Sequence, residues 1–284
     1  INYPALLQGE RKIKTSQNYF EGWYFKNTNR ENSIAFIPGI SIQNGQKSAF
    51  IQIITNKASY YVPFSFSAFH FCHMPFSIQI GDNYFSLEEV RISISTPEVS
   101  IQGHVRYQER QEIQKSKFAP NIMGPFSYFP FMECHHAILS MKHLVDGSFT
   151  LNDTDFIFEK DTGYIEKDWG TSFPRSYIWT QSNCFSNPST SFFCSIAHIP
   201  FIITSFTGFI CVLMVNGEEY RFTTYNGSKL IHYKKSKDNI NIKLKKDDYV
   251  LQFFSDNHNY LPLLAPKCGN MNQTIQESIN SIIS

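Results

Sequence analysis

Apolar and polar residues alternate in short segments along most of this chain, and few stretches repeat with the period of a helix. Val99, Ile101, Val105 and Tyr107, for example, alternate with polar side chains. Because successive side chains of a strand point to opposite faces of a sheet, this pattern predicts a strand with one buried and one solvated face. The recurrence of such segments predicts an all-β protein with little helix.

Turn signals separate the predicted strands and join them into hairpins. The Asn216-Gly217 dipeptide is typical of a tight hairpin turn, and Asp146-Gly147 predicts a further turn. The expected hairpins join residues 76–80 to 84–95, 206–215 to 218–225, and 240–244 to 249–254. Strands of this regularity favour an antiparallel sandwich or barrel.

Three prolines lie close together near the middle of the chain. Pro120, Pro125 and Pro130 continue neither a helix nor a central strand. We therefore predict an N-terminal β domain over residues 1–120 and a C-terminal β domain over residues 121–284. Each half contains a segment that mixes aromatic and acidic residues, at 19–24 and 164–169. This similarity is compatible with a duplicated unit.

The composition is that of a folded protein with little net charge. Hydrophobic residues make up 42% of the 284 residues and charged residues only 17%, which is far from the composition of a disordered chain. The net charge of +1 gives no strong field to attract phosphates, so we expect no nucleic-acid partner. Residues 176–217 contain no Asp, Glu, Lys or Arg, which is typical of strands that line an apolar pocket or pack in a core. An uncharged ligand fits this composition.

Three features of the sequence indicate the cellular compartment of the protein. Residues 1–14 show no basic start followed by an apolar run and a cleavage site, so we predict no secretory signal there. The apolar run 199–215 is short for a membrane span and is interrupted by polar residues. The six cysteines are widely spaced without a Cys-x-x-Cys pair, which favours free thiols in a reducing compartment. We expect a cytoplasmic protein.

Two carboxylates share one face of a predicted strand. Tyr164, Glu166 and Asp168 alternate with Ile165 and Lys167, so they point the same way. If that face lines an aromatic cavity, desolvation and like charge would raise the pKa of one carboxyl and keep a proton available near neutrality. The alternative is a solvent-facing strand whose carboxylates pair with lysines.

A second acidic side chain lies in an aromatic segment near the N-terminus. Glu21 is expected on the same strand face as Tyr19 and Trp23, with Tyr24 on the opposite face. A buried Glu21 would need a hydrogen-bond donor or a proton, because an unpaired buried carboxylate is costly. The alternative is an ion pair at the surface.

Histidine and cysteine cluster at residues 134–136. Cys134, His135 and His136 are zinc-type ligands, but adjacent residues of a strand point apart, so we expect no metal here. One of these imidazoles could instead orient a hydroxyl or transfer a proton inside a cavity. A hydrogen-bonded structural histidine is the alternative.

Four aromatic and acidic motifs follow one another along most of the chain. They are FEGWYFK at residues 20–26, PFMECH at 130–135, GYIEKDWG at 163–170, and SFP at 172–174 followed by W-x-Q-x-N at 179–183. In this order they resemble the tocopherol cyclase family. The resemblance implies two consecutive lipocalin-like β-barrel or sandwich halves and a relation to proteins of the carotenoid hydratase type, which protonate an isoprenoid double bond. It also implies a final strand beyond residues 271–284, a segment whose own pattern fits a short helix or a strand.

The resemblance implies acid-catalysed cyclisation or hydration of a prenylated quinol or related isoprenoid lipid. Protonating an unactivated alkene requires a neutral carboxylic acid in a dry pocket, and ring faces stabilise the resulting cation. The expected catalytic residues are Glu166, Asp168, Glu21 and His135. The expected substrate-binding residues are Trp23, Tyr24, Tyr164, Trp169, Trp179, Gln181 and Asn183. We expect no cofactor, and peripheral contact with a membrane for access to the lipid.

Two other functions are compatible with the same residues. A carrier that only sequesters a hydrophobic lipid would have the same aromatic cavity, but it would not need a protonated carboxyl in it. A metal-dependent hydrolase would use Cys134 and His135 as ligands. Metal analysis of the purified protein distinguishes the hydrolase from the other two.

Overall fold

The structure is a computed structural model that describes residues 17–130, 132–201 and 204–284. Residues 1–14, for which we predict no secretory signal, and residues 202–203 of the apolar run lie outside the described residues. Over the described part of the chain the only helices are the short 3-10 turns η1 (Phe66–Ala68), η2 (Gly124–Tyr128) and η3 (Thr224–Asn226). None of them is long and apolar enough to span a membrane.

The first part of the chain forms one antiparallel sheet of eleven strands, in the order β4-β3-β2-β1-β11-β10-β9-β8-β7-β6-β5. The strands are β1 (Tyr19–Thr28), β2 (Ser33–Gln43), β3 (Gln46–Thr55), β4 (Ser59–Ser65), β5 (Phe69–His73), β6 (Phe76–Ile80), β7 (Asn83–Ser86), β8 (Glu89–Ser95), β9 (Ser100–Gln111), β10 (Cys134–Leu151) and β11 (Thr154–Gly170). The meander is closed by the pairing of β1 with β11, while β4 and β5 form its two free edges. This is the strand order of an up-and-down, lipocalin-like barrel with one seam open.

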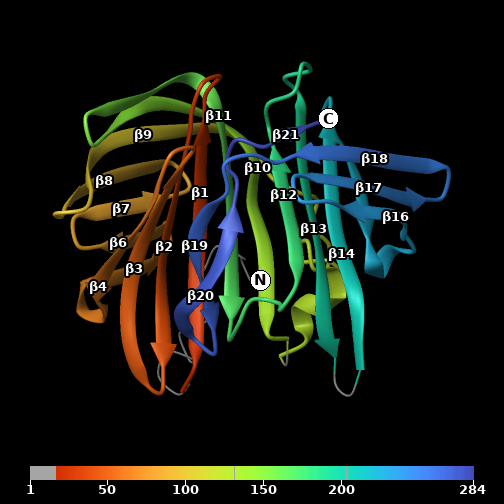
Figure 1. Cartoon of the computed structure of the whole chain (residues 1–284), viewed down its shortest axis with the longest axis horizontal. Coiled ribbons are helices and arrows are strands. Elements are labelled where there is room, and N and C mark those ends of the chain that lie inside the picture. The colour runs from red at the N-terminus through yellow and green to blue at the C-terminus, as the bar shows by residue number, and fades with distance from the viewer. Residues whose placement is uncertain (1–16, 131, 202–203) are drawn as a thin grey trace.

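The sheet is rolled around a large apolar core. In Figure 1 the strands β1–β4 run in front of β6–β9, which cross behind them. Apolar side chains from both layers fill the space between, among them Phe25, Phe36, Phe85 and Phe149. Alternate residues of each strand therefore point into this barrel, and the remaining residues of β1, β10 and β11 point out of it.

Three smaller sheets follow. They contain β12 (Tyr177–Ser182), β13 (Thr190–Phe201), β14 (Thr204–Val215) and β15 (Glu218–Thr223); β16 (Lys229–Lys235), β17 (Asn239–Lys246), β18 (Tyr249–Asp256) and β21 (Ile282–Ile283); and β19 (Leu261–Lys267) with β20 (Asn270–Glu277). The predicted fold class, all-β with lipocalin-like antiparallel units and little helix, is confirmed. Residues 270–277 are a strand, which decides the alternative left open for the C-terminal segment. The domain division at residue 120 stays a prediction; strands from both sides of it share the eleven-stranded sheet.

The predicted hairpins are present, with one strand divided. Asn216 and Gly217 join β14 to β15 with φ of 52° and 84°, the left-handed backbone that a tight hairpin turn requires. The predicted strand 84–95 is instead two strands, β7 and β8. Its division follows from a local turn, in which the Ser86 hydroxyl accepts hydrogen bonds from the backbone N–H groups of Glu88 and Glu89.

The turn predicted at Asp146-Gly147 is wrong. Strand β10 continues through both residues, and the irregularity there is a β-bulge between Val145 and Asp146. Gly147 has φ of 128°, and a Cβ atom at this position would lie 2.2 Å from the carbonyl oxygen of His104. The glycine is therefore used for close approach to β9 rather than for a chain reversal.

Candidate active site

The pairing of β1, β11 and β10 decides which side chains share a face. Tyr24 lies opposite Glu166 in the β1–β11 ladder, and His136 lies opposite Asp168 in the β10–β11 ladder. Directly opposed residues of an antiparallel pair point to the same side of the sheet. All four therefore leave the barrel on its outer face. The shared face predicted for Glu166 and Asp168 is confirmed.

This outer face lines a cavity of about 610 Å³. Strands β12–β14, the hairpin β19–β20 and the end of β18 contribute the opposite walls, with Tyr177, Trp179, Phe209 and Glu277 among the lining side chains. The walls combine apolar and aromatic side chains with polar and charged ones, among them Lys26, His136 and Glu166. A pocket of this kind suits a ligand with a large apolar part that polar groups orient.

Glu166 is the buried acid of this pocket and is only 4% exposed. Its Oε2 accepts hydrogen bonds from the Tyr164 hydroxyl at 2.6 Å and from the Trp179 indole N–H at 3.0 Å. Burial raises the pKa of Glu166 to about 7, helped by the charge of Asp168, while His136 and the two hydrogen bonds act in the opposite direction. A substantial fraction of this carboxyl therefore carries a proton near neutral pH.

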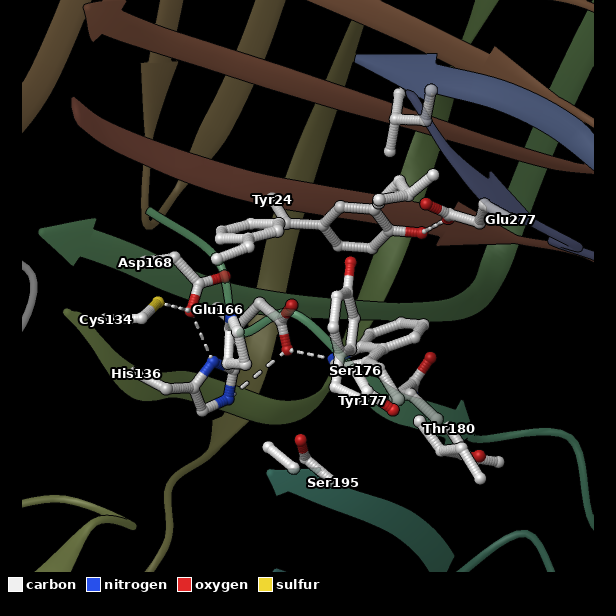
Figure 2. Close-up of a pocket in the computed structure, with 18 of the residues that line it drawn as sticks. Tyr24, Cys134, His136, Glu166, Asp168, Ser176, Tyr177, Thr180, Ser195 and Glu277 are labelled. Atoms are coloured by element: carbon white, nitrogen blue, oxygen red, sulfur yellow. Dashed lines mark hydrogen bonds and ion pairs between the residues drawn. The ribbon is translucent and has the colours of Figure 1, made fainter. Parts of the chain in front are cut away.

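His136 lies between the two carboxyl groups (Figure 2). Its Nδ1 is 2.9 Å from Asp168 Oδ1 and its Nε2 is 3.5 Å from Glu166 Oε2. Burial lowers the pKa of His136, but the charges of Asp168 and Glu166 outweigh that effect and raise it to about 9. The imidazole is therefore cationic at neutral pH, and it is stacked on the Phe193 ring at 5.0 Å. A cation here favours a negative charge on Glu166 after that residue has lost a proton.

A second polar pair lies across the pocket (Figure 2). The Tyr24 hydroxyl donates a hydrogen bond to Glu277 Oε1 at 2.8 Å, and Lys26 Nζ donates one to Gln181 Oε1 at 3.0 Å. Burial raises the pKa of Glu277, whereas the Tyr24 hydrogen bond and the charge of Lys26 lower it. The rings of Tyr24 and Trp179 are 5.5 Å apart. Because Trp179 also donates a hydrogen bond to Glu166, it connects the Tyr24–Glu277 pair to Glu166.

Five of the predicted site residues line this pocket: Tyr24, Glu166, Asp168, Trp179 and Gln181. The Tyr164 ring is fully buried beside it and reaches Glu166 through its hydroxyl. Asn183 lies beyond the pocket at the end of β12, where its side chain donates a hydrogen bond to the Gly163 carbonyl oxygen. The catalytic and binding roles of all these residues stay predictions.

The other predicted site residues point into the barrel, on the opposite face of the sheet from the pocket. Glu21 forms an ion pair with Lys167, with Nζ and Oε1 2.5 Å apart and both side chains fully buried. The Lys167 ammonium lies over the rings of Trp23 and Trp169, and His135 stacks on Trp169 at 5.2 Å. The predicted grouping with Glu166 is therefore corrected for Glu21, Trp23, Trp169 and His135, because strand alternation sends them to the other side. The alternative of a surface ion pair for Glu21 is also wrong.

The site residues expected from the sequence omit several polar residues of the pocket, among them Lys26, His136, Tyr177 and Glu277. Strand alternation could have found Lys26, two residues after Tyr24. The choice of His136 over His135 depends on the register of β10 against β11, which the motif alone does not specify. Glu277 lies in the C-terminal strand, and no sequence signal connected it to the acidic motif.

Three of the site residues also form the one group with metal-ligand potential in the described part of the chain. His136, Glu166 and Asp168 each offer one ligand atom, and these atoms lie within 4.8 Å of one another. We interpret the group as a proton-sharing cluster, because the imidazole already lies between the two carboxyls. The expectation of no metal stays a prediction.

The shifted pKa values predict how stability changes with pH. The folded pKa of His136 is raised from 6.5 to about 9 and that of Glu166 from 4.5 to about 7, so the folded state binds more protons than the unfolded chain. We therefore expect the free energy of unfolding to fall as the pH rises, between pH 4.5 and 7 through Glu166 and between pH 6.5 and 9 through His136, by roughly 3 kcal/mol at most for the histidine. Urea unfolding at a series of pH values measures this.

The double variant H136Q/E166Q is the control for this pH effect. It keeps the other titrating groups of the protein, including Lys26, Lys167 and Glu277, but removes the ionisable groups of His136 and Glu166. Its stability should change less between pH 6.5 and 9 than that of the unsubstituted protein. Parallel profiles for the two proteins would contradict the shifted pKa values.

The fold and the site define a lipocalin-like β protein that holds a buried carboxylic acid in an aromatic pocket. Residues 94–232 match the family model described as tocopherol cyclase-like. This confirms the resemblance to the tocopherol cyclase family that the sequence motifs indicate.

Individual relatives agree with this match over parts of the chain. A probable chloroplastic tocopherol cyclase of Oryza sativa subsp. japonica is 39% identical over 66 residues, which cover 23% of this chain and 14% of the rice protein. The chloroplastic tocopherol cyclase of Zea mays is 25% identical over 236 residues, covering 62% of this chain and 48% of the maize protein. The chain thus spans less than half the length of these relatives. The crystal structure of kievitone hydratase from Nectria haematococca aligns with 92% of this chain and 83% of its own, at 14% identity and a TM-score of 0.48.

Proposed function

We propose that this protein catalyses the acid-initiated cyclisation, or hydration, of a prenylated quinol or a related isoprenoid lipid. The observation that carries the proposal is the buried carboxyl of Glu166, which holds a proton near neutral pH inside an aromatic pocket. Protonation of an alkene requires such a neutral acid shielded from water. The names of the rice and maize relatives support a small hydrophobic substrate of the tocopherol type.

The side chains of the pocket suit each step of this reaction. Glu166 transfers its proton to one alkene carbon, and a tertiary cation forms at the other. The ring faces of Tyr24, Tyr177 and Trp179 stabilise this cation without reacting with it. The His136 cation stabilises the carboxylate that Glu166 becomes, since opposite charges attract strongly in a site that excludes water. An oxygen of the substrate's own hydroxyl, or of water, then forms the new C–O bond.

Incubation with a prenylated hydroquinone in deuterated water tests the proposal. The cyclised or hydrated product should contain one new deuteron bound to carbon, at the alkene position that Glu166 protonates. Lipid that is bound but chemically unchanged would support the carrier function instead. Turnover that is lost on dialysis against EDTA and restored by a metal ion would support the metal-dependent alternative.

We also propose that the sheet β16–β17–β18 contacts an anionic membrane surface from which the lipid enters. Residues 229–256, which form this sheet, contain seven lysines and four aspartates, and Val250 and Phe254 on β18 are about half exposed. Lys235 of this sheet lines the pocket, so the basic surface lies beside it. Each lysine near an anionic surface contributes roughly 1 kcal/mol to binding. Salt-sensitive co-sedimentation with vesicles that contain phosphatidylserine, but not with neutral vesicles, is expected; equal sedimentation with both would contradict the proposal.

A further inference from the structure

We propose that Glu277 is the catalytic base of this site, which takes the proton from the hydroxyl group whose oxygen attacks the cation. The inference rests on the proposed function. It assigns two carboxyls of one pocket to opposite tasks, with Glu166 as the acid and Glu277 as the base. Both line the same pocket, and a chain of contacts joins them: Trp179 donates a hydrogen bond to Glu166, Tyr24 donates one to Glu277, and the two rings are 5.5 Å apart.

The hairpin β19–β20 holds Glu277 in place over the barrel. The side-chain amide of Gln52 on β3 donates a hydrogen bond to the Leu264 carbonyl oxygen at 3.0 Å and accepts one from the Leu264 N–H at 3.1 Å. The Ser59 hydroxyl of β4 donates a third hydrogen bond, to the Pro262 carbonyl oxygen. These contacts fix β19, and Glu277, the last residue of β20, pairs with Leu261 of β19 in the hairpin ladder. A base must be positioned in this way before it can act.

The other polar groups of the cluster around Glu166 are already engaged. His136 is cationic at neutral pH and faces a carboxyl oxygen with each ring nitrogen, so it cannot accept another proton. Asp168 is paired with that imidazole. Glu277 has one hydroxyl partner, Tyr24, bound to its Oε1. Its carboxylate therefore keeps acceptor capacity for a substrate hydroxyl.

The charges that face Glu277 suit a base that works near neutrality. Tyr24 and Lys26 reach it from β1, Glu166 lies across the pocket on β11, and Tyr177 faces it from β12. Burial raises the pKa of Glu277, and the Tyr24 hydrogen bond and Lys26 limit that rise. A carboxylate whose pKa is raised is a stronger base than an exposed one, and the charge of Lys26 favours its ionised form.

The proposed step is balanced in atoms and charge. The O–H bond of Glu166 breaks and a C–H bond forms at the alkene. The hydroxyl oxygen of the substrate, or of water, bonds to the cationic carbon, and its proton passes to the Glu277 carboxylate. Glu166 begins protonated and ends ionised, Glu277 does the reverse, and solvent restores both when the product leaves. No oxidant or reductant is needed.

The variant Glu277→Gln tests this assignment with the prenylated hydroquinone in deuterated water. Alkene protonation should continue, while C–O bond formation falls about 100-fold, within the range for loss of a general base. The cation would then lose a proton from carbon instead, so that recovered substrate and isomeric alkenes acquire deuterium. Glu277→Asp, which keeps a carboxylate, should restore part of the ring closure. Glu98→Gln, at an exposed turn far from the pocket, is the matched control and should behave as the unsubstituted protein.

The outcomes separate this inference from the proposed function. If the unsubstituted protein deuterates the product and Glu277→Gln closes the ring at the same rate with the same pH profile, Glu277 is not the base although the proposed reaction stands. A folded Glu277→Gln variant that loses deuterium incorporation and ring closure equally would also overturn the assignment. If the unsubstituted protein forms no deuterated product, the proposed function itself fails.

Discussion

Replacing Glu166 by glutamine is expected to reduce turnover of a prenylated hydroquinone by about 1,000-fold, because general acid catalysis contributes factors of this size. Glutamine keeps the shape of the side chain and can still accept hydrogen bonds from Tyr164 and Trp179. It has no acidic proton to give to the alkene. The measurement is the rate of product formation, together with deuterium incorporation at carbon and circular dichroism as a check of the fold.

The variant Asp168→Asn is the comparison for this result. Asp168 holds His136 at 2.9 Å and is itself partly exposed. Its loss should weaken the imidazolium, and it removes one of the charges that raise the pKa of Glu166, but it leaves the acid itself in place. We expect a smaller loss of turnover than for Glu166→Gln. Full activity of a folded Glu166→Gln variant would remove Glu166 from the role of acid, and a greater loss in Asp168→Asn would transfer that role to Asp168.

Replacing Lys167 by methionine is expected to lower the free energy of unfolding by about 3–5 kcal/mol. The substitution leaves the Glu21 carboxylate inside the barrel, where both members of the ion pair are fully buried. The Tyr19 hydroxyl, which donates a hydrogen bond to Glu21 at 2.7 Å, does not supply the positive charge that Lys167 supplies. Removing one member of a buried ion pair is far more costly than removing both charges together. Urea denaturation at pH 7 measures the change.

The double variant Glu21→Gln/Lys167→Met separates charge burial from packing. It removes both charges while keeping side chains of similar volume, so most of the stability lost in the single variant should return. A single variant that loses less than about 1 kcal/mol would mean that the pair is not isolated from water. Because Lys167 lies between Glu166 and Asp168 in the chain, this pair also anchors the strand that carries the acidic site.

Strand alternation made much of the site predictable. The motif around residue 166 was enough to place Glu166 and Asp168 on one face, since this depends only on the two-residue period of a strand. The same rule placed Tyr24 opposite to Glu21 and Trp23. It did not decide which of these faces lines the pocket. Which face lines the pocket depends on the direction in which the sheet rolls. The expected site residues therefore included side chains from both faces.

The sequence by itself determined the all-β class, the hairpins with strong turn residues and the division of each strand into two faces. These follow from interactions between residues close in the chain. Only the tertiary structure decided that β1 pairs with β11, that His136 rather than His135 joins the two acids, and that Glu277 faces them across the pocket. The physical reason is that these neighbours are set by the burial of apolar faces between distant strands, and local periodicity contains no information about which distant strands will meet.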